Sequence, residues 1–186
     1  MALHDAGAFS ATYFRYPAIY GPRQMAPSEW SVIRRVRDGR KTMILPDQGL
    51  LLFSRAAARN AAHAVLLAVD RPVAATGRTY NCADDELLSL RQWMHVIAEI
   101  LGAELELVSL PFELATMAHG LARCPGHVVV DTSRIRRELG YRDVVSFREG
   151  MAEAVEWYLA NPVTPEEYPW MTDPFDYEQE DRLVAA

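Results

Sequence analysis

Residues 15–24, with the sequence Arg-Tyr-Pro-Ala-Ile-Tyr-Gly-Pro-Arg-Gln, restrict the fold of this chain more than any other stretch. They follow a β-prone run at 11–14 and contain two prolines and a glycine, which predicts a strand that leads directly into a rigid, non-helical loop. Pro17 and Pro22 fix their own φ angles and push the residues before them toward extended backbone. In an open α/β sheet, ligands bind at loops that follow the ends of strands. This stretch therefore predicts an α/β fold with a ligand site beside the loop.

The rest of the chain predicts an alternation of short strands and helices. Apolar spacing and turn residues place helices at residues 29–38, 56–70, 90–101, 112–123, 134–139 and 147–158. They place strands at residues 42–45, 50–53, 79–82, 105–110 and 128–130. Three serines are expected to cap helices, the third in a capping box with Glu149: Ser28, Ser89 and Ser146. On helix 56–70, the expected buried face consists of Ala61, Val65, Ala68 and Val69.

Several motifs resemble the extended short-chain dehydrogenase/reductase family, the NAD(P)-dependent epimerases and dehydratases of nucleotide sugars and related substrates. Residues 15–22 resemble its Arg-x-Pro/Phe-x-x-Tyr-Gly-Pro stretch, and the similarity continues in family order from residue 8 to residue 161. Its further pieces are Tyr80-Asn81 and residues 90–101, 131–133, 139–141 and 150–158. The resemblance implies a partial Rossmann-like fold: the late strands of a doubly wound sheet plus a small, mainly helical substrate lobe.

The resemblance also implies roles for single residues. Beside the nicotinamide ring of NAD or NADP it places Pro17, Ala18 and Ile19. At the border of the substrate it places Tyr20, Arg23 and Gln24. Asn81 follows a predicted strand, where the family asparagine often supports the substrate loop; a plain turn-forming asparagine is the alternative.

One family motif departs from its usual form. The pattern Arg-x-Phe-x-Tyr-Val-x-Asp aligns with residues 53–60, where Phe53, Ala57 and Asn60 stand in place of the arginine, tyrosine and aspartate. Arg55 and Arg59 lie close by in the sequence and are candidates to replace the missing arginine at the substrate. The departure favours a different substrate or a non-catalytic role.

The chemistry of the family needs two motifs that this sequence lacks. A dinucleotide site requires a glycine-rich turn from a strand into a helix, and no Gly-x-Gly-x-x-Gly or Gly-x-x-Gly-x-x-Gly is present. The family dyad is Tyr-x-x-x-Lys, but the one lysine is Lys41 and the residue four before it is Arg37. We therefore expect a truncated relative that is inactive alone, with a missing N-terminal dinucleotide-binding half or a homo-oligomer as its partner.

Charge and cysteine content exclude several other classes of function. A net charge of −6 and a pI near 5.4 disfavour binding to nucleic acid or to an anionic membrane. No apolar run approaches the ~20 residues that span a bilayer. Cys82 and Cys124 lie far apart without metal-ligand spacing, so we expect a reduced cytoplasmic protein with no metal site.

Two charged clusters allow more than one interpretation. The basic cluster Arg34, Arg35, Arg37, Arg40 and Lys41 is expected to be a solvated helix face, the alternative being a clamp for the diphosphate of a nucleotide-linked substrate. The acidic run 84–86 is expected to be a solvated loop, the alternative being a catalytic carboxylate pair.

Two functional hypotheses follow. In the first, residues 1–161 form the substrate-binding part of an enzyme similar to the epimerases, dehydratases and reductases, and residues 162–186 form an acidic, proline-rich tail. Its substrate is a small molecule, a nucleotide sugar or a related carbonyl or hydroxyl compound. In the second, the chain is a non-catalytic binding or assembly module. Because late strands alone leave sheet edges and apolar surface exposed, we expect an unusual exposed patch, self-association or reliance on a partner.

Overall fold

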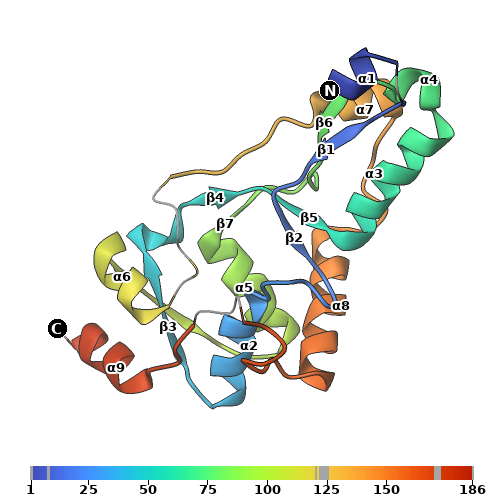
Figure 1. The fold of residues 1–186 in the computed structure, drawn as a ribbon. Coiled ribbons are helices and arrows are strands. Elements are labelled where there is room, and N and C mark those ends of the chain that lie inside the picture. The colour runs from blue at the N-terminus through green and yellow to red at the C-terminus, as the bar shows by residue number, and fades with distance from the viewer. Residues whose placement is uncertain (1, 8, 120, 122–125, 170–172, 186) are drawn as a thin grey trace. The chain divides into compact units, whose positions relative to one another are not determined.

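The computed structural model describes residues 2–7, 9–119, 121, 126–169 and 173–185, which form two compact units (Figure 1). Unit 1 comprises Met1–Tyr20, Ser54–Leu87 and Val129–Gly150, and unit 2 comprises Gly21–Phe53, Leu88–Val128 and Met151–Ala186. Each unit combines short strands with helices, so the predicted α/β class is confirmed. Cys124 and the tail residues 170–172 lie outside the described residues.

Unit 1 is built on two parallel strand pairs. Strand β1 (Tyr13–Arg15) pairs with β6 (Thr79–Asn81), and β2 (Ala18–Tyr20) pairs with β5 (Arg55–Ala57). The stretch after Arg15 was expected to be a loop throughout, but three of its residues form β2, because the extended backbone that Pro17 favours suits a strand. The helices of unit 1 are α1 (Ala2–Asp5), α3 (Ala58–Asp70), α4 (Pro72–Ala75), α7 (Ser133–Leu139) and the first turn of α8 (Phe147–Ala160).

The core of unit 1 contains small residues from α3 and larger ones from β6 and α7. Its buried members are Ala64, Ala68, Ala75, Tyr80, Cys82, Ile135, Leu139 and Tyr141. The predicted face of α3 is wrong in part: Val65 and Val69 are 42% and 67% exposed, whereas Asn60 and Ala64 are buried. Alanines allow the helix to approach the sheet closely, so the face with the smallest side chains is the buried one.

Unit 2 has one parallel and one antiparallel strand pair. Strand β3 (Thr42–Pro46) runs parallel to β8 (Glu106–Leu110), and β4 (Leu52–Phe53) pairs with β7 (Leu88–Ser89). Its remaining elements are α2 (Glu29–Arg37), the 3₁₀ turn η1 (Asp47–Gly49), α5 (Leu90–Ile100), α6 (Phe112–Ala118), α9 (Tyr177–Ala185) and the rest of α8. Helix α2 packs on α5, and Figure 1 shows α6 beside β3 and α9. Ile44, Ala115 and Ala118 form a small core there.

Local capping signals predict most helix boundaries correctly. The Ser89 hydroxyl accepts a hydrogen bond from the backbone amide of Gln92. The side-chain carbonyl of Gln92 accepts one from the backbone amide of Ser89, so a full capping box starts α5. Ser146 and Glu149 make the same reciprocal pair at the start of α8. Gly140 ends α7 with a φ of 65°, in the left-handed region that glycine adopts without strain.

Three predictions about local structure are wrong. Ser28 makes no capping hydrogen bond, because its own backbone is already helical. Helix 112–123 ends at Ala118, since His119 turns to extended backbone to place its side chain in the core. Residues 128–130 form only an isolated bridge between Val128 and Phe53, and Val129 is 53% exposed. Among the described residues, no helix has the length and apolar content that a membrane span requires.

Candidate functional site

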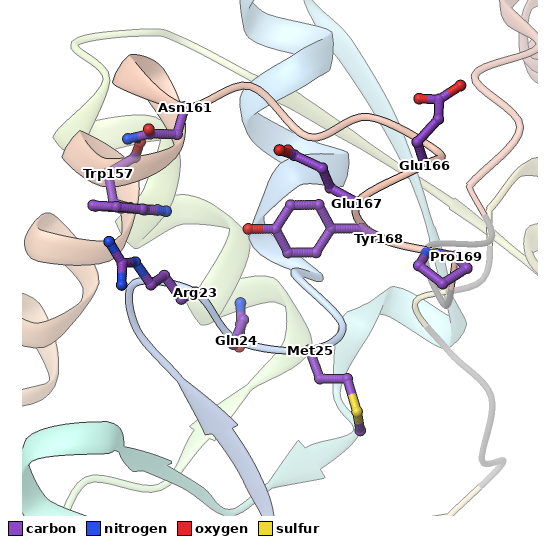
Figure 2. Close-up of a pocket in the computed structure, with 9 residues that line it drawn as sticks. All are labelled: Arg23, Gln24, Met25, Trp157, Asn161, Glu166, Glu167, Tyr168 and Pro169. Carbon is purple, nitrogen blue, oxygen red and sulfur yellow. Dashed lines mark hydrogen bonds between the residues drawn. The ribbon is translucent and has the colours of Figure 1, made fainter.

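Unit 2 contains a cavity of about 690 Å³ that is largely open to solvent, and its volume is within the range of small-molecule sites; its lining residues are drawn in Figure 2. The cavity is formed by the loop after β2, the end of α8 and the segment that follows α8. Its lining residues are Arg23, Gln24, Met25, Trp157, Asn161, Glu166, Glu167, Tyr168 and Pro169. Two of the residues predicted to border the substrate, Arg23 and Gln24, are therefore part of this cavity.

A sharp turn in the backbone directs Arg23 into the cavity. Gly21 has a φ of 137° and Arg23 a φ of 63°, with Pro22 between them. A side chain other than glycine is uncommon at positive φ, and such strain is found preferentially at functional sites. The Tyr-Gly-Pro-Arg sequence is thus suited to a turn that presents the arginine rather than to a regular strand end.

Arg23 contacts the aromatic side of the cavity. Its guanidinium carbon lies 4.9 Å from the ring centroid of Trp157, which is cation–π geometry. The indole Nε1 of Trp157 is buried and has no hydrogen-bond partner among the residues that the structure describes. Figure 2 shows Arg23 next to the indole ring, on the side of the cavity that α8 forms.

Hydrogen bonds fix the loop that carries Arg23. The Gln24 amide donates to the carboxylate of Glu29, which is buried at the start of α2. The Tyr158 hydroxyl donates to the carbonyl of Gly21 at 3.4 Å, and burial raises the pKa of Tyr158, so this phenol stays protonated. The loop is thereby attached to both α2 and α8.

The other side of the cavity comes from the segment after α8. The ring of Tyr168 lies 6.3 Å from that of Tyr158 in an edge-on contact, and its backbone amide donates to the Thr164 carbonyl at 3.0 Å. In Figure 2, the Tyr168 hydroxyl and the Glu167 carboxylate point toward Trp157, whereas the Glu166 carboxylate points away. Sequence reasoning missed these residues; the signal was the set of aromatic residues in an otherwise acidic segment.

The remaining predicted site residues belong to unit 1. Ala18 and Ile19 are exposed on β2 and Pro17 is half-buried before it. Tyr20 is buried, and its hydroxyl donates to Oδ2 of Asp84 at 2.8 Å. Asn81 is at the end of β6, and its amide donates to the Asp131 carbonyl at 3.2 Å.

Arg55 and Arg59, the candidate replacements for the missing arginine, lie on either side of the junction between β5 and α3. Arg55 is half-buried in β5, and its carbonyl accepts from the Asp84 amide at 2.8 Å. Arg59 is exposed in the first turn of α3.

Asp84 corrects the expectation that residues 84–86 form a solvated loop. Asp84 is only 8% exposed and accepts hydrogen bonds from the Tyr20 hydroxyl, the Ala57 amide and the Asn60 side chain. Burial raises the pKa of Asp84, while these hydrogen bonds oppose the increase. Its neighbours in the run, Asp85 and Glu86, are exposed as expected.

Asn60, which stands where the family pattern has an aspartate, makes four hydrogen bonds in unit 1. Its amide donates to Asp84 at 2.8 Å and to the Val145 carbonyl at 3.0 Å, and its carbonyl accepts from the amides of Val144 and Val145. A carboxylate at this position would have no donor for Asp84 and would repel it. Asn60 therefore has a structural role in unit 1.

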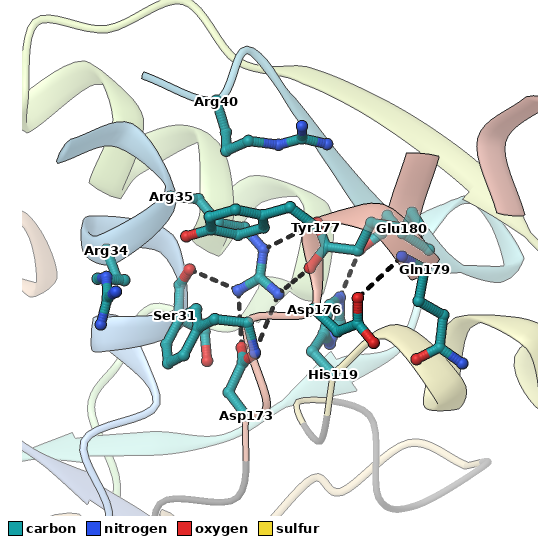
Figure 3. Close-up of polar contacts among 12 residues, drawn as sticks. Ser31, Arg34, Arg35, Arg40, His119, Asp173, Asp176, Tyr177, Gln179 and Glu180 are labelled. Carbon is teal, nitrogen blue, oxygen red and sulfur yellow. Dashed lines mark hydrogen bonds and ion pairs between the residues drawn. The ribbon is translucent and has the colours of Figure 1, made fainter. Parts of the chain in front are cut away.

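The basic cluster on α2 fits neither of its two expected roles at Arg35 (Figure 3). Arg35 is fully buried and forms ion pairs with Asp173 at 2.7 Å and Glu180 at 2.5 Å, two residues of the C-terminal segment. Burial disfavours the charged guanidinium, but these hydrogen bonds outweigh it and raise the pKa of Arg35. Arg40 pairs with Asp181. Arg37 and Lys41 are exposed as a solvated face requires, and the side chain of Arg34 is 43% exposed and pairs with Asp38.

Comparison with known proteins identifies the fold. No protein-family model matches the chain. The dTDP-glucose 4,6-dehydratase of Salmonella typhimurium is 31% identical over 88 residues, which is 46% of this chain and 24% of that enzyme. The UDP-glucose 4-epimerase of Thermotoga maritima, solved with UDP-glucose, matches 82% of this chain with a TM-score of 0.64 and 22% identity. The dTDP-glucose 4,6-dehydratase of Streptomyces venezuelae, solved with NAD, matches 86% with a TM-score of 0.62 and 23% identity.

This chain has the epimerase/dehydratase fold. It spans about half the length of both solved structures, 47% of each. The resemblance to the extended short-chain dehydrogenases/reductases and the predicted Rossmann-like fold are thus confirmed. Within this part-length epimerase/dehydratase fold, unit 2 contains the cavity with Arg23 and Gln24, and unit 1 contains the hydrogen-bond cluster of Tyr20, Asn60 and Asp84. Among the described residues, no group of three His, Cys, Asp or Glu is arranged to hold a metal ion.

Proposed function

We propose that the chain is the substrate-binding portion of an NAD(P)-dependent epimerase-, dehydratase- or reductase-like protein. One observation carries the proposal: Arg23 and Gln24, which directly follow the Tyr-Gly-Pro turn, line a cavity of about 690 Å³. Arginine supplies several fixed donors and glutamine both a donor and an acceptor, as recognition of a hydroxyl- or phosphate-bearing ligand requires. The similar proteins act on dTDP-glucose or were solved with UDP-glucose, so a nucleotide sugar or a related substrate is the proposed ligand.

The proposal gives this chain a limited part in cofactor binding. Ile19 is 40% exposed and, with Ala18 and Pro17, offers an apolar border for a nicotinamide ring. Among the described residues, however, no glycine-rich turn leads directly from a strand into a helix N-terminus, since the single Gly21 after β2 is eight residues before α2, and a direct glycine-rich turn is what a pyrophosphate needs. The residues present therefore fit only the edge of NAD or NADP. Hydride and proton transfer are proposed to require residues outside this chain, in a cytoplasmic setting.

A calorimetric titration of the purified chain tests the proposal. UDP-glucose and dTDP-glucose are expected to bind saturably, and Arg23→Ala is expected to weaken binding about 10- to 150-fold, because one charge-assisted hydrogen bond contributes about 1.5–3 kcal/mol. The matched control is Arg182→Ala, an exposed arginine of unit 2 that does not line the cavity. Absence of binding by the unmodified chain, or equal loss in both variants, would contradict the proposal.

A second candidate function is a non-catalytic assembly module, and exposed apolar side chains favour it. On α3 and α4 of unit 1, Val65, Leu66, Val69 and Val73 are between 42% and 94% exposed. Such a group of apolar side chains is typical of a protein contact. Analytical ultracentrifugation of the chain and of Val69→Lys distinguishes the two candidates: a concentration-dependent oligomer that Val69→Lys dissociates favours assembly, whereas a monomer in both samples does not.

A further inference from the structure

We propose that the cavity of unit 2 recognises the uncharged, hydroxyl-rich sugar ring of its ligand rather than a diphosphate, and that Tyr168 and Glu167 determine this specificity. The inference rests on the proposed function and names the part of the substrate that is bound in this cavity. It also assigns a ligand-binding role to the segment after α8, which motif comparison leaves without one.

The charges that line the cavity argue against a phosphate group. Arg23 contributes one positive charge and Glu167, whose carboxylate points into the cavity, contributes one negative charge, whereas the carboxylate of Glu166 points away. A diphosphate carries about two negative charges, and sites for it are built from arginines and backbone amides, without carboxylates beside them. Arg35 of α2, which makes a bidentate contact with Asp173, is already bound to that residue and to Glu180. The ligand group that this cavity fits is therefore neutral.

The same residues suit a sugar hydroxyl. A hydroxyl both donates and accepts hydrogen bonds, so it needs an acceptor on one side and a donor on the other. In the cavity the Glu167 carboxylate is the acceptor and the Arg23 guanidinium is the donor, while the Asn161 side chain already donates to the Trp157 carbonyl at 3.0 Å. Figure 2 shows Glu167 directed into the cavity between Asn161 and Tyr168.

Two aromatic rings provide the apolar part of such a site. Tyr168 is half-buried and points toward Trp157, which lies on the opposite side of the cavity in Figure 2. The aliphatic C–H groups of a hexose carry partial positive charge and pack on the electron-rich faces of aromatic rings.

The test compares three ligands, UDP-glucose, UDP and methyl α-D-glucopyranoside, by calorimetry and by competition. The variants are Tyr168→Ala, Tyr168→Phe and Glu167→Gln, and the control is Glu178→Gln, a 91% exposed carboxylate on α9. We expect the glycoside to compete with UDP-glucose. Tyr168→Ala and Glu167→Gln are each expected to weaken the binding of UDP-glucose at least fivefold and to leave the affinity for UDP unchanged. Tyr168→Phe is expected to have an intermediate effect, and Glu178→Gln is expected to have none.

The outcomes separate this inference from the proposed function. If UDP-glucose binds but UDP binds equally well and the variants affect neither, sugar recognition here is wrong and the proposed function stands. If the glycoside binds and responds to the variants while UDP-glucose does not bind, sugar recognition stands and the nucleotide-sugar function is wrong. If none of the three ligands binds the unmodified chain, both are wrong. Circular dichroism of each variant verifies that it is folded, and Tyr168→Phe retains the packing if Tyr168→Ala does not fold.

Discussion

The Tyr20 hydroxyl donates a 2.8 Å hydrogen bond to Asp84 in the interior of unit 1, where the two residues are 1% and 8% exposed. Tyr20 belongs to the Tyr-Gly-Pro motif, and Asp84 to an acidic run 64 residues later. The tyrosine of the motif thus fixes a loop of its own unit through a buried carboxylate. Because Arg23 follows it by three residues, the motif combines a structural tyrosine with an arginine that lines the cavity.

Removal of the Tyr20 hydroxyl is expected to destabilise the protein. Tyr20→Phe leaves Asp84 with two donors, the Ala57 amide and Asn60, so the free energy of unfolding should fall by about 1–2 kcal/mol. Urea denaturation of the unmodified protein and of Tyr20→Phe measures this change in unfolding free energy. Asp85→Asn is the control, because Asp85 is 65% exposed and a surface ion pair contributes at most about 1 kcal/mol. An unchanged denaturation midpoint for Tyr20→Phe would show that the hydrogen bond contributes nothing.

The buried arginine of α2 is expected to be among the most sensitive positions of unit 2. Arg35→Met leaves Asp173 and Glu180 as unpaired buried carboxylates, so we expect a loss of about 3–5 kcal/mol in unfolding free energy. Arg34→Ala, one residue earlier and 43% exposed, should change it by less than about 0.5 kcal/mol. If Arg35→Met fails to fold, Glu180→Gln serves as the milder variant in the same urea titration. Equal effects of the Arg34 and Arg35 variants would contradict the structure.

Because His119 is buried, we expect the protein to lose stability in mild acid. Burial lowers the pKa of His119 from its usual 6.5, and its Nε2 donates to the Ile44 carbonyl at 2.6 Å. Below pH 6.5 the unfolded chain binds a proton at this histidine that the folded chain does not, so stability falls as the pH decreases. His119→Gln keeps a donor for Ile44 but cannot titrate. The difference in unfolding free energy between the two proteins should therefore change between pH 7 and pH 5; a constant difference would contradict the lowered pKa.

Two serines at helix starts provide a matched test of capping. Ser89→Ala removes the capping box of α5 and should lower the unfolding free energy by about 0.5–2 kcal/mol. Ser28→Ala, at the corresponding position of α2, should have little effect because Ser28 makes no capping hydrogen bond. Thermal and urea denaturation of both variants measure the difference. Similar destabilisation by the two substitutions would show that Ser28 is a cap after all.

Features that depend on neighbouring residues could be predicted from the sequence, and those that depend on distant ones could not. Ser89 and Ser146 each bond to a residue three positions later, so local sequence predicts both helix starts, Ser89 as a cap and Ser146 with Glu149 as a capping box. The pairs of Arg35 with Asp173 and Glu180 join residues 138 and 145 positions apart, and no local pattern distinguishes Arg35 from the exposed Arg37.

In the candidate site, too, local sequence predicts some residues, and others depend on the packing of distant segments. The motif predicts Arg23 and Gln24, because both follow the Tyr-Gly-Pro turn directly. Trp157 and Tyr168 reach the cavity only through the packing of α8 and the segment after it, which periodicity does not specify. Asn60 appears in the sequence as a lost aspartate, and only its four hydrogen bonds show why an asparagine is required there.

The central claim is that a nucleotide sugar binds in the cavity beside Arg23, and fluorine NMR tests it most directly. The chain is labelled with 5-fluorotryptophan, the Trp157 resonance is assigned with Trp157→Phe, and the sample is titrated with UDP-glucose. We expect a saturable shift of the Trp157 resonance that is strongly reduced in Arg23→Ala and unchanged in Arg182→Ala. The resonances of Trp30 and Trp93, which are in the core, are expected to stay in place. A Trp157 resonance that stays in place at saturating UDP-glucose would contradict the central claim.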